Sequence, residues 1–152
     1  MTLKELENTL PNGLHDAEVQ RITVDYSQRT LMLELEIWVG SMDDPPERRE
    51  AYRKGWLEIS GLIFLVLEPP DPRYPFKDSD LRIDGCDMSK NLSSELLRSL
   101  PQDSFVRSLW VNEWNAFMHI AAKSAEVTWL NNGAVTYRTS QEPKAKSQKP
   151  IS

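Results

Sequence analysis

A histidine and an aspartate stand side by side in the segment GLHDAEV, just before the first strand-like stretch of the chain. Imidazole and carboxylate groups are good ligands for divalent metal ions, and together they can also act as an acid–base pair. A metal site needs three or four ligands, so His15 and Asp16 alone are not enough. His119, the other histidine, would have to approach them in the fold, with Asp84 or Asp87 completing the site.

We favour a structural interpretation of this dipeptide, in which Asp16 accepts backbone N–H bonds at a turn and His15 packs at the opening of a strand. No HxH, HExxH or CxxC spacing accompanies the pair. His119 falls in the middle of the expected strand AFMHIAA, where a half-buried, hydrogen-bonded histidine is ordinary. The chain also lacks a GxSxG motif and a glycine-rich phosphate loop. We therefore expect no cofactor, and a divalent metal only if His15, Asp16 and His119 converge.

The five tryptophans are the other residues with an evident capacity to bind. Trp38 alternates with the apolar residues of its strand and so shares a face with Glu34 and Glu36. We expect these three residues, together with Trp114, to form a surface that contacts a protein partner, because exposed tryptophan anchors interfaces. The alternative is that Trp38 and Trp114 are buried in a two-layer fold. We assign Trp56 to the core, along with Trp129.

Hydrophobic periodicity predicts the elements that must position these residues. Leucines at helical spacing follow Thr2, which has the capping-box relation to Glu5, so a short N-terminal helix is expected. Alternation on both sides of the segment SQR predicts a β-hairpin over residues 22–39. The proline-broken segments 41–50 and 69–80 are expected to be loops.

The rest of the chain reads as further strands with one more helix. A strand over residues 54–68 should be interrupted at Gly61 by a bulge or a bend, and Ser93 or Ser94 should cap the second helix. Other strands are expected at 81–83, 105–111, 116–122, 125–130 and 135–137, with a two-residue hairpin at Lys123-Ser124. The sequence predicts a mainly β or β-rich α+β fold, an antiparallel sandwich or strongly curved sheet of about seven or eight strands with one or two short peripheral helices.

Length and composition define the organisation of the chain. Its 152 residues fit one domain, which we place at residues 1–138, followed by a disordered, basic tail at 139–152. The single cysteine, Cys86, cannot form an internal disulfide, which is typical of a reducing compartment. No signal peptide and no apolar run of bilayer length is visible, so we expect a cytoplasmic protein that does not enter a membrane.

Charge is unevenly distributed along the chain. The net charge is −5, and because the last fifteen residues carry +3, residues 1–137 carry −8. An acidic body repels nucleic acid and favours a basic protein partner, although an acidic surface that only keeps a protein soluble is the commoner case. Oligomeric state is not determined by this pattern.

The opening GLHDAEV, a strand pair ending in WVG, the loop EPPDPRYP and the later segment NEWNAFMHIAA resemble uncharacterised bacterial β-rich domains. Domains with a similar HDA strand opening have been grouped with immunity proteins of polymorphic toxin systems. The resemblance implies a small cytoplasmic protein that binds and blocks a toxin, and it supplies no catalytic residues. An acidic inhibitor of a basic toxin would gain association rate from charge complementarity.

Three functional hypotheses follow, in order of preference. The first is a non-enzymatic protein-binding module, in which Trp38→Ala weakens partner binding and leaves the fold intact. The second is a metal-dependent enzyme or metal-binding domain that uses His15, Asp16 and His119. The third is a carbohydrate- or small-ligand-binding β-sandwich, in which tryptophan stacks on a sugar face.

Overall fold

The computed structural model describes residues 1–74, 79–87 and 91–138, so the predicted tail at 139–152 lies outside the described residues. The described chain is mainly β, as predicted. Its strands are β1 (Glu18–Asp25), β2 (Thr30–Trp38), β3 (Ala51–Ser60), β4 (Phe64–Leu67), β5 (Leu81–Asp87), β6 (Phe105–Val111), β7 (Ala116–Ala122), β8 (Ser124–Trp129) and β9 (Val135–Tyr137).

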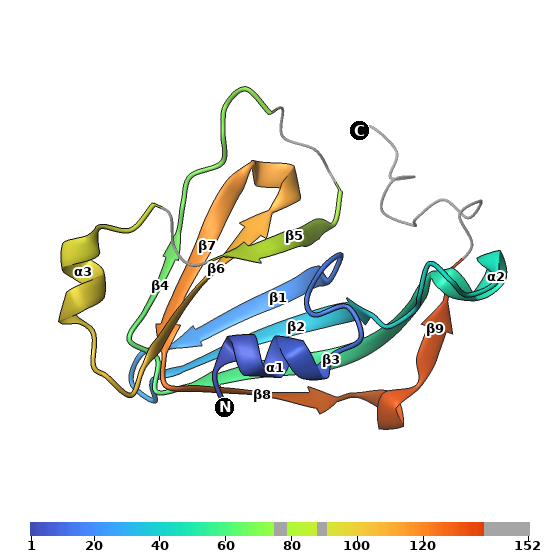
Figure 1. Ribbon diagram of the computed structural model, residues 1–152, viewed down its shortest axis with the longest axis horizontal. Helices are drawn as coiled ribbons and strands as arrows, with labels where there is room; N and C mark the ends of the chain where they lie inside the picture. Colours follow the sequence, from blue (N-terminus) through green and yellow to red (C-terminus); the bar gives the residue numbers. More distant parts are fainter. Residues whose placement is uncertain (75–78, 88–90, 139–152) are drawn as a thin grey trace.

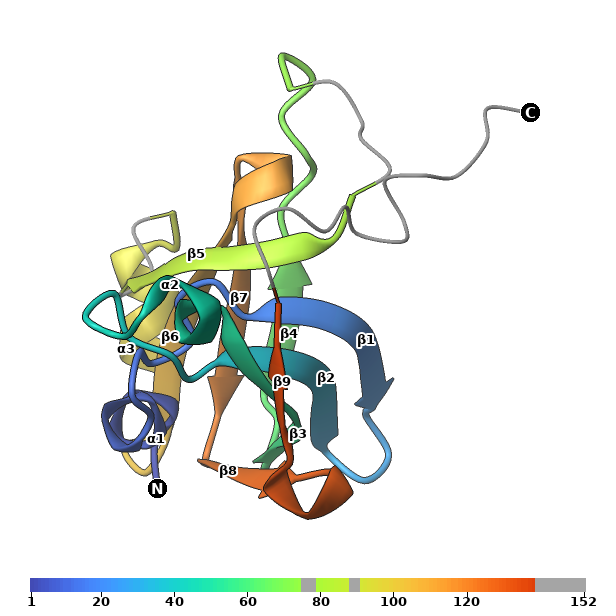
Figure 2. The ribbon, with the colours of Figure 1, turned by 90° about the vertical axis from the view of Figure 1, so that its right-hand side faces the viewer.

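The nine strands form one antiparallel sheet in the order β4-β7-β6-β5-β1-β2-β3-β8, and β9 also pairs with β3 (Figure 1). Only two residue pairs join β5 to β1, and there the sheet changes direction (Figure 2). Of the two predicted architectures, a sandwich and a strongly curved sheet, the structure therefore has the curved sheet, which remains open. Its two parts enclose the core between them.

Short helices lie at the periphery of this sheet: α1 (Leu3–Thr9), α2 (Pro46–Arg49) and α3 (Ser94–Ser99), with 3-10 turns η1 (Asn112–Trp114) and η2 (Asn131–Gly133). The hydroxyl oxygen of Thr2 accepts a 3.1 Å bond from the Glu5 N–H, which confirms the predicted cap of α1. The segment 41–50 was expected to be a loop, and it contains the single turn α2. None of the described helices has the length or apolar composition that a bilayer-spanning helix requires.

The β1–β2 hairpin confirms the clearest periodicity in the sequence. Residues of β2 alternate strictly between buried and half-buried positions, and Leu31, Leu33, Leu35 and Ile37 are completely buried. They share one hydrophobic core with apolar residues from the other part of the sheet, among them Leu109 on β6. Helix α1 adds its leucines to the same core, and each buried leucine contributes about 1.5–3 kcal/mol relative to exposure.

The predicted hairpin at Lys123-Ser124 is wrong. Strand β7 pairs with β4 and β6, whereas β8 pairs with β3, so the chain turns a corner there instead of folding back on itself. The Lys123 N–H donates to the Ser60 carbonyl oxygen at 3.1 Å, where β3 also turns toward β4. Gly61 makes this second turn with a φ of +65°, which agrees with the predicted bend.

Candidate functional site

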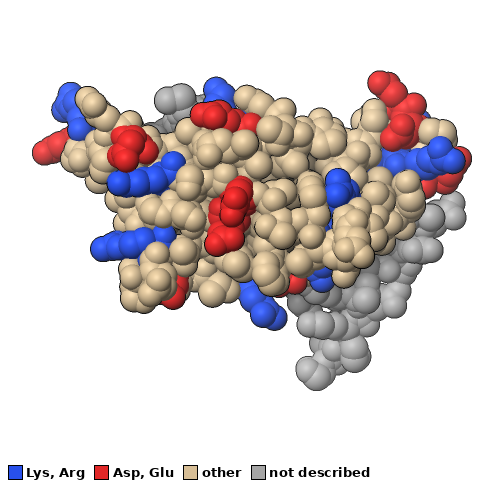
Figure 3. Space-filling view, turned by 90° about the horizontal axis from the view of Figure 1, so that it is seen from below, with Lys and Arg blue, Asp and Glu red and all other residues tan. Residues whose placement is uncertain are grey.

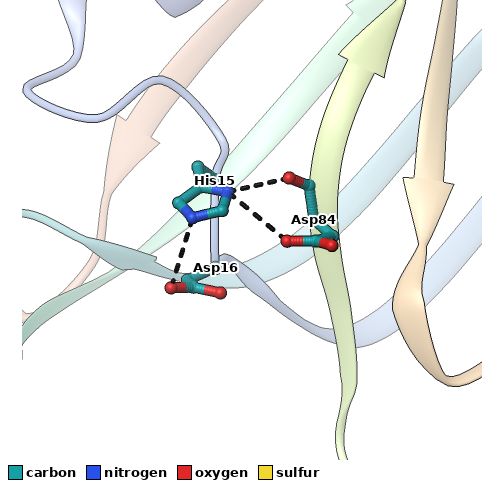
Figure 4. A group of neighbouring side chains, drawn as sticks. All are labelled: His15, Asp16 and Asp84. Carbon is teal, nitrogen blue, oxygen red and sulfur yellow. Dashed lines mark hydrogen bonds and ion pairs between the residues drawn. The ribbon is translucent and has the colours of Figure 1, made fainter.

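His15 and Asp16 lie in the segment leading into β1, and Asp84 lies beside them on β5 (Figure 4). Backbone bonds fix this contact: the Asp16 N–H donates to the Ile83 carbonyl at 2.7 Å, and the Ile83 N–H donates to the Ala17 carbonyl at 2.9 Å. Asp84 occupies a register shift between β5 and β6, and a bulge of this kind redirects a side chain. The topology thus brings together three residues that could bind a cation.

Hydrogen bonding orients the imidazole of His15. Its Nδ1 lies 2.8 Å from the backbone carbonyl oxygen of Asp84, and because a carbonyl only accepts, Nδ1 carries the proton. When the ring is neutral, Nε2 therefore presents a lone pair, and it faces Asp16 Oδ2 at 3.6 Å. This separation is too long for a direct hydrogen bond but suits two ligands of one bound cation.

The three side chains are accessible to solvent, with 50% of His15, 37% of Asp16 and 50% of Asp84 exposed. One ligand atom can be chosen from each so that all three lie within 4.8 Å of one another. A divalent ion held there would have three protein ligands and keep open positions for water. Such open coordination is typical of catalytic rather than structural metal sites.

The structure does not bring His119 to this group. Its ring is buried on β7, where Nδ1 lies 2.7 Å from Ser108 Oγ and Nε2 lies 2.8 Å from Glu68 Oε2. This Ser–His–Glu chain was missed in the sequence, because only the cross-strand pairing of Ser108 with His119 brings the first two together. Ser108 is completely buried, so its hydroxyl is not presented to a substrate.

Glu68 is the acceptor at the outer end of this chain, where 22% of its side chain is exposed. Besides His119, its carboxylate accepts bonds from the Phe117 N–H at 2.8 Å and the Asn91 side chain at 2.8 Å. Burial raises the pKa of Glu68, whereas the hydrogen bonds from His119, Phe117 and Asn91 lower it. The hydrogen bonds together outweigh the effect of burial, so the pKa of Glu68 lies below its usual value. The arrangement ties the start of the loop after β4 to the β6–β7 pair.

Glu34, Glu36 and Trp38 share the outward face of β2, as predicted, but each has partners within the chain. The Trp38 indole N–H donates to the Arg49 carbonyl at 2.6 Å, so this half-buried ring also helps to fix the end of α2. The Glu34 carboxylate lies 3.7 Å from the Lys54 ammonium group, and the Glu36 carboxylate forms an ion pair with Arg138. Trp38 is thus a poor candidate for a freely exposed anchor.

The remaining tryptophans divide differently from the prediction. Trp114 and Trp129 are both half-buried and pack against the core. The guanidinium carbon of Arg53 lies 3.9 Å from the centre of the Trp129 ring. The assignment of Trp56 to the core is wrong, because its side chain is 39% exposed. In β3 the neighbours of Trp56 in sequence, Gly55 and Leu57, occupy the inward positions, so Trp56 must face outward.

Trp56 stands among acidic residues on the outer side of β2, β3 and β8. It is paired with Glu34 on β2, and the next outward pair along β3 and β8 is Glu58 with Glu126. We call these four residues the Trp56 face. Figure 3 looks at the molecule from below, on the side of β8, and shows an acidic group near the middle of this face with basic side chains spaced around it.

Comparisons with protein-family models, with curated proteins and with solved structures give no match for this chain.

Proposed function

We propose that this protein is a non-enzymatic binding module whose Trp56 face contacts a basic protein. The observation that carries the proposal is an exposed tryptophan with three glutamates around it on a regular sheet surface. A central aromatic anchor with a polar rim is the common arrangement of energetically important residues in protein interfaces. The sheet supplies a rigid support, so little ordering would be required on binding.

The charge of the Trp56 face indicates the chemistry of the partner. Glu58 and Glu126 stand directly opposite each other, and like charges in such a pair destabilise a sheet. Within the described residues neither carboxylate has an ion-pair partner, whereas Glu34 approaches Arg21 and Lys54. A cationic side chain of a partner would relieve this repulsion. A basic toxin, as implied by the resemblance to immunity proteins, is one partner of this kind.

Neutralising Glu58 and Glu126 distinguishes a role in partner binding from a role in the stability of the fold. We expect Glu58→Gln and Glu126→Gln to leave the free energy of unfolding unchanged or to raise it by about 0.2–1 kcal/mol, because a repulsion is removed. The same variants should capture less of any basic protein from a cell lysate, measured by quantitative mass spectrometry. Glu95→Gln, in the exposed helix α3, is the matched control. Lower stability with unchanged capture would assign both carboxylates a structural role instead.

A second candidate function is divalent-metal binding by His15, Asp16 and Asp84. It is favoured by one observation, the orientation of the His15 Nε2 lone pair toward a carboxylate 3.6 Å away. Isothermal titration with Zn²⁺ and Mn²⁺ should show one equivalent bound, with binding lost in His15→Ala and weakened at least tenfold in Asp84→Asn. Wild-type protein that binds neither ion would eliminate this candidate.

A further inference from the structure

Arg138 holds together an enclosed pair of carboxylates on the outer side of the sheet. Its Nη1 donates to Glu18 Oε2 and its Nη2 donates to Glu36 Oε2, both at 2.6 Å. The guanidinium carbon lies 4.0 Å from the centre of the Tyr52 ring, so the cation is also stacked on an aromatic face. Two carboxylates and a ring are the partners that a planar guanidinium prefers.

The acidic part of this arrangement requires a cation. Glu18 and Glu36 are paired directly across β1 and β2, and only 2% of the Glu18 side chain is exposed. A carboxylate buried to that extent is costly unless it is paired and hydrogen-bonded. Burial, with Glu50 nearby, raises the pKa of Tyr52 to about 12, so its ring stays neutral beneath the cation. The site is built for a positive group that is flat and donates two hydrogen bonds.

The element that delivers Arg138 is weakly held by comparison. Strand β9 has three residues, Val135–Tyr137, all of them exposed, and pairs with the chain through residues 51–53 of β3. Beyond it, the Arg138 N–H donates to the Glu50 carbonyl at 2.8 Å. A three-residue edge strand opens at a small cost relative to the central strands. Strand β9 can therefore open locally without unfolding of the core, and an incoming guanidinium would take over the bonds to Glu18 and Glu36 that Arg138 gives up.

The site is continuous with the Trp56 face. Along β2, Glu36 is two residues from Glu34, so the two outward side chains are about 7 Å apart. A basic segment bound across Trp56 would reach Glu36 with its next residues. We propose that Glu18, Glu36 and Tyr52 form a guanidinium-binding site, which Arg138 fills in the isolated chain and an arginine of the basic partner fills in the complex. The second part of this statement rests on the proposed function.

The first test replaces the internal ligand with a small one. Arg138→Ala should lower Tm by about 10 °C, because the buried Glu18 carboxylate loses its ion pair with Arg138. Added ethylguanidinium at millimolar concentration should restore much of this loss, whereas ethylammonium, which cannot form the paired bonds, should not. Arg138→Ala combined with Glu18→Gln should show no such rescue. Equal effects of the two cations would overturn the assignment of a guanidinium site.

The second test uses the unaltered protein and does not depend on a folded variant. Hydrogen–deuterium exchange of residues 135–138 should accelerate when N-acetyl-arginine amide is added, and N-acetyl-lysine amide should have a much smaller effect. Unchanged exchange with both compounds would show that Arg138 is a permanent clamp and would overturn the exchange with a partner. Neither test requires the partner. Failure of the guanidinium site in these tests can therefore be distinguished from failure of the Trp56 face to capture a protein.

Discussion

At the scale of single residues, the two histidines have opposite surroundings. His15 is half exposed and its Nε2 is oriented toward solvent and a carboxylate, whereas His119 is buried between Ser108 and Glu68. Their separation follows from topology, since β1 borders β5 and β7 lies between β4 and β6. A histidine in a mid-strand position is therefore part of the packing, and the one in the loop before a strand is available for binding.

The buried chain at His119 predicts a pH dependence of stability. Because the folded-state pKa of Glu68 is lowered, its contribution to stability is fully present above the ordinary, unfolded-state pKa of a glutamate and is lost as the pH falls through the lower folded-state pKa. Glu68→Gln should lower Tm at pH 7 and make the decrease in Tm from pH 6 to pH 3 smaller than in the wild type. Thermal unfolding followed by circular dichroism measures both. An unchanged acid dependence would mean that other carboxylates control it.

At the scale of elements, local periodicity was enough to predict most strands, and pairing between distant strands was not predicted. The alternation in β2 predicts the correct element, and the strand predicted over 54–68 is observed as β3 and β4. The direction of Trp56 depends on which face of β3 packs on the core. The short joint at Lys123 predicts a hairpin because two adjacent strands with such a joint usually pair, but the two strands pair with different neighbours. Similarly, the sequence leaves Asp84 and Asp87 as alternatives, since the approach of Asp84 to His15 depends on the β5 bulge.

The corner between β3 and β4 makes a prediction about glycine. Gly61 has positive φ, and a Cβ built there would lie 2.8 Å from the Cβ of Lys123. Gly61→Ala should therefore reduce the free energy of unfolding by about 1–3 kcal/mol. Gly85→Ala is the matched control, because a Cβ at that position meets no atom within 4 Å, and it should change stability by less than about 0.5 kcal/mol. Urea titration of both variants measures the difference, and similar losses would contradict this account of the corner.

At the scale of the whole molecule, the fold separates a shared core from an acidic outer face. The outer side of β1, β2, β3 and β8 holds two acidic cross-strand pairs: Glu18 with Glu36, which Arg138 neutralises, and Glu58 with Glu126, which no described cation neutralises. Net negative charge on the first 137 residues agrees with this asymmetry. The charge excess was predictable from sequence, but its concentration around Trp56 required the strand register.

Comparative capture with wild-type protein and Trp56→Ala tests the binding proposal most directly. Each protein is immobilised, exposed to the same cell lysate and analysed by quantitative mass spectrometry. The control is Tyr74→Ala, which removes another exposed aromatic side chain, on the loop after β4. We predict that Trp56→Ala keeps the wild-type Tm. It should capture at least tenfold less of a basic protein that the wild type and Tyr74→Ala both capture. Identical capture by all three proteins would contradict the proposal that the Trp56 face binds a partner.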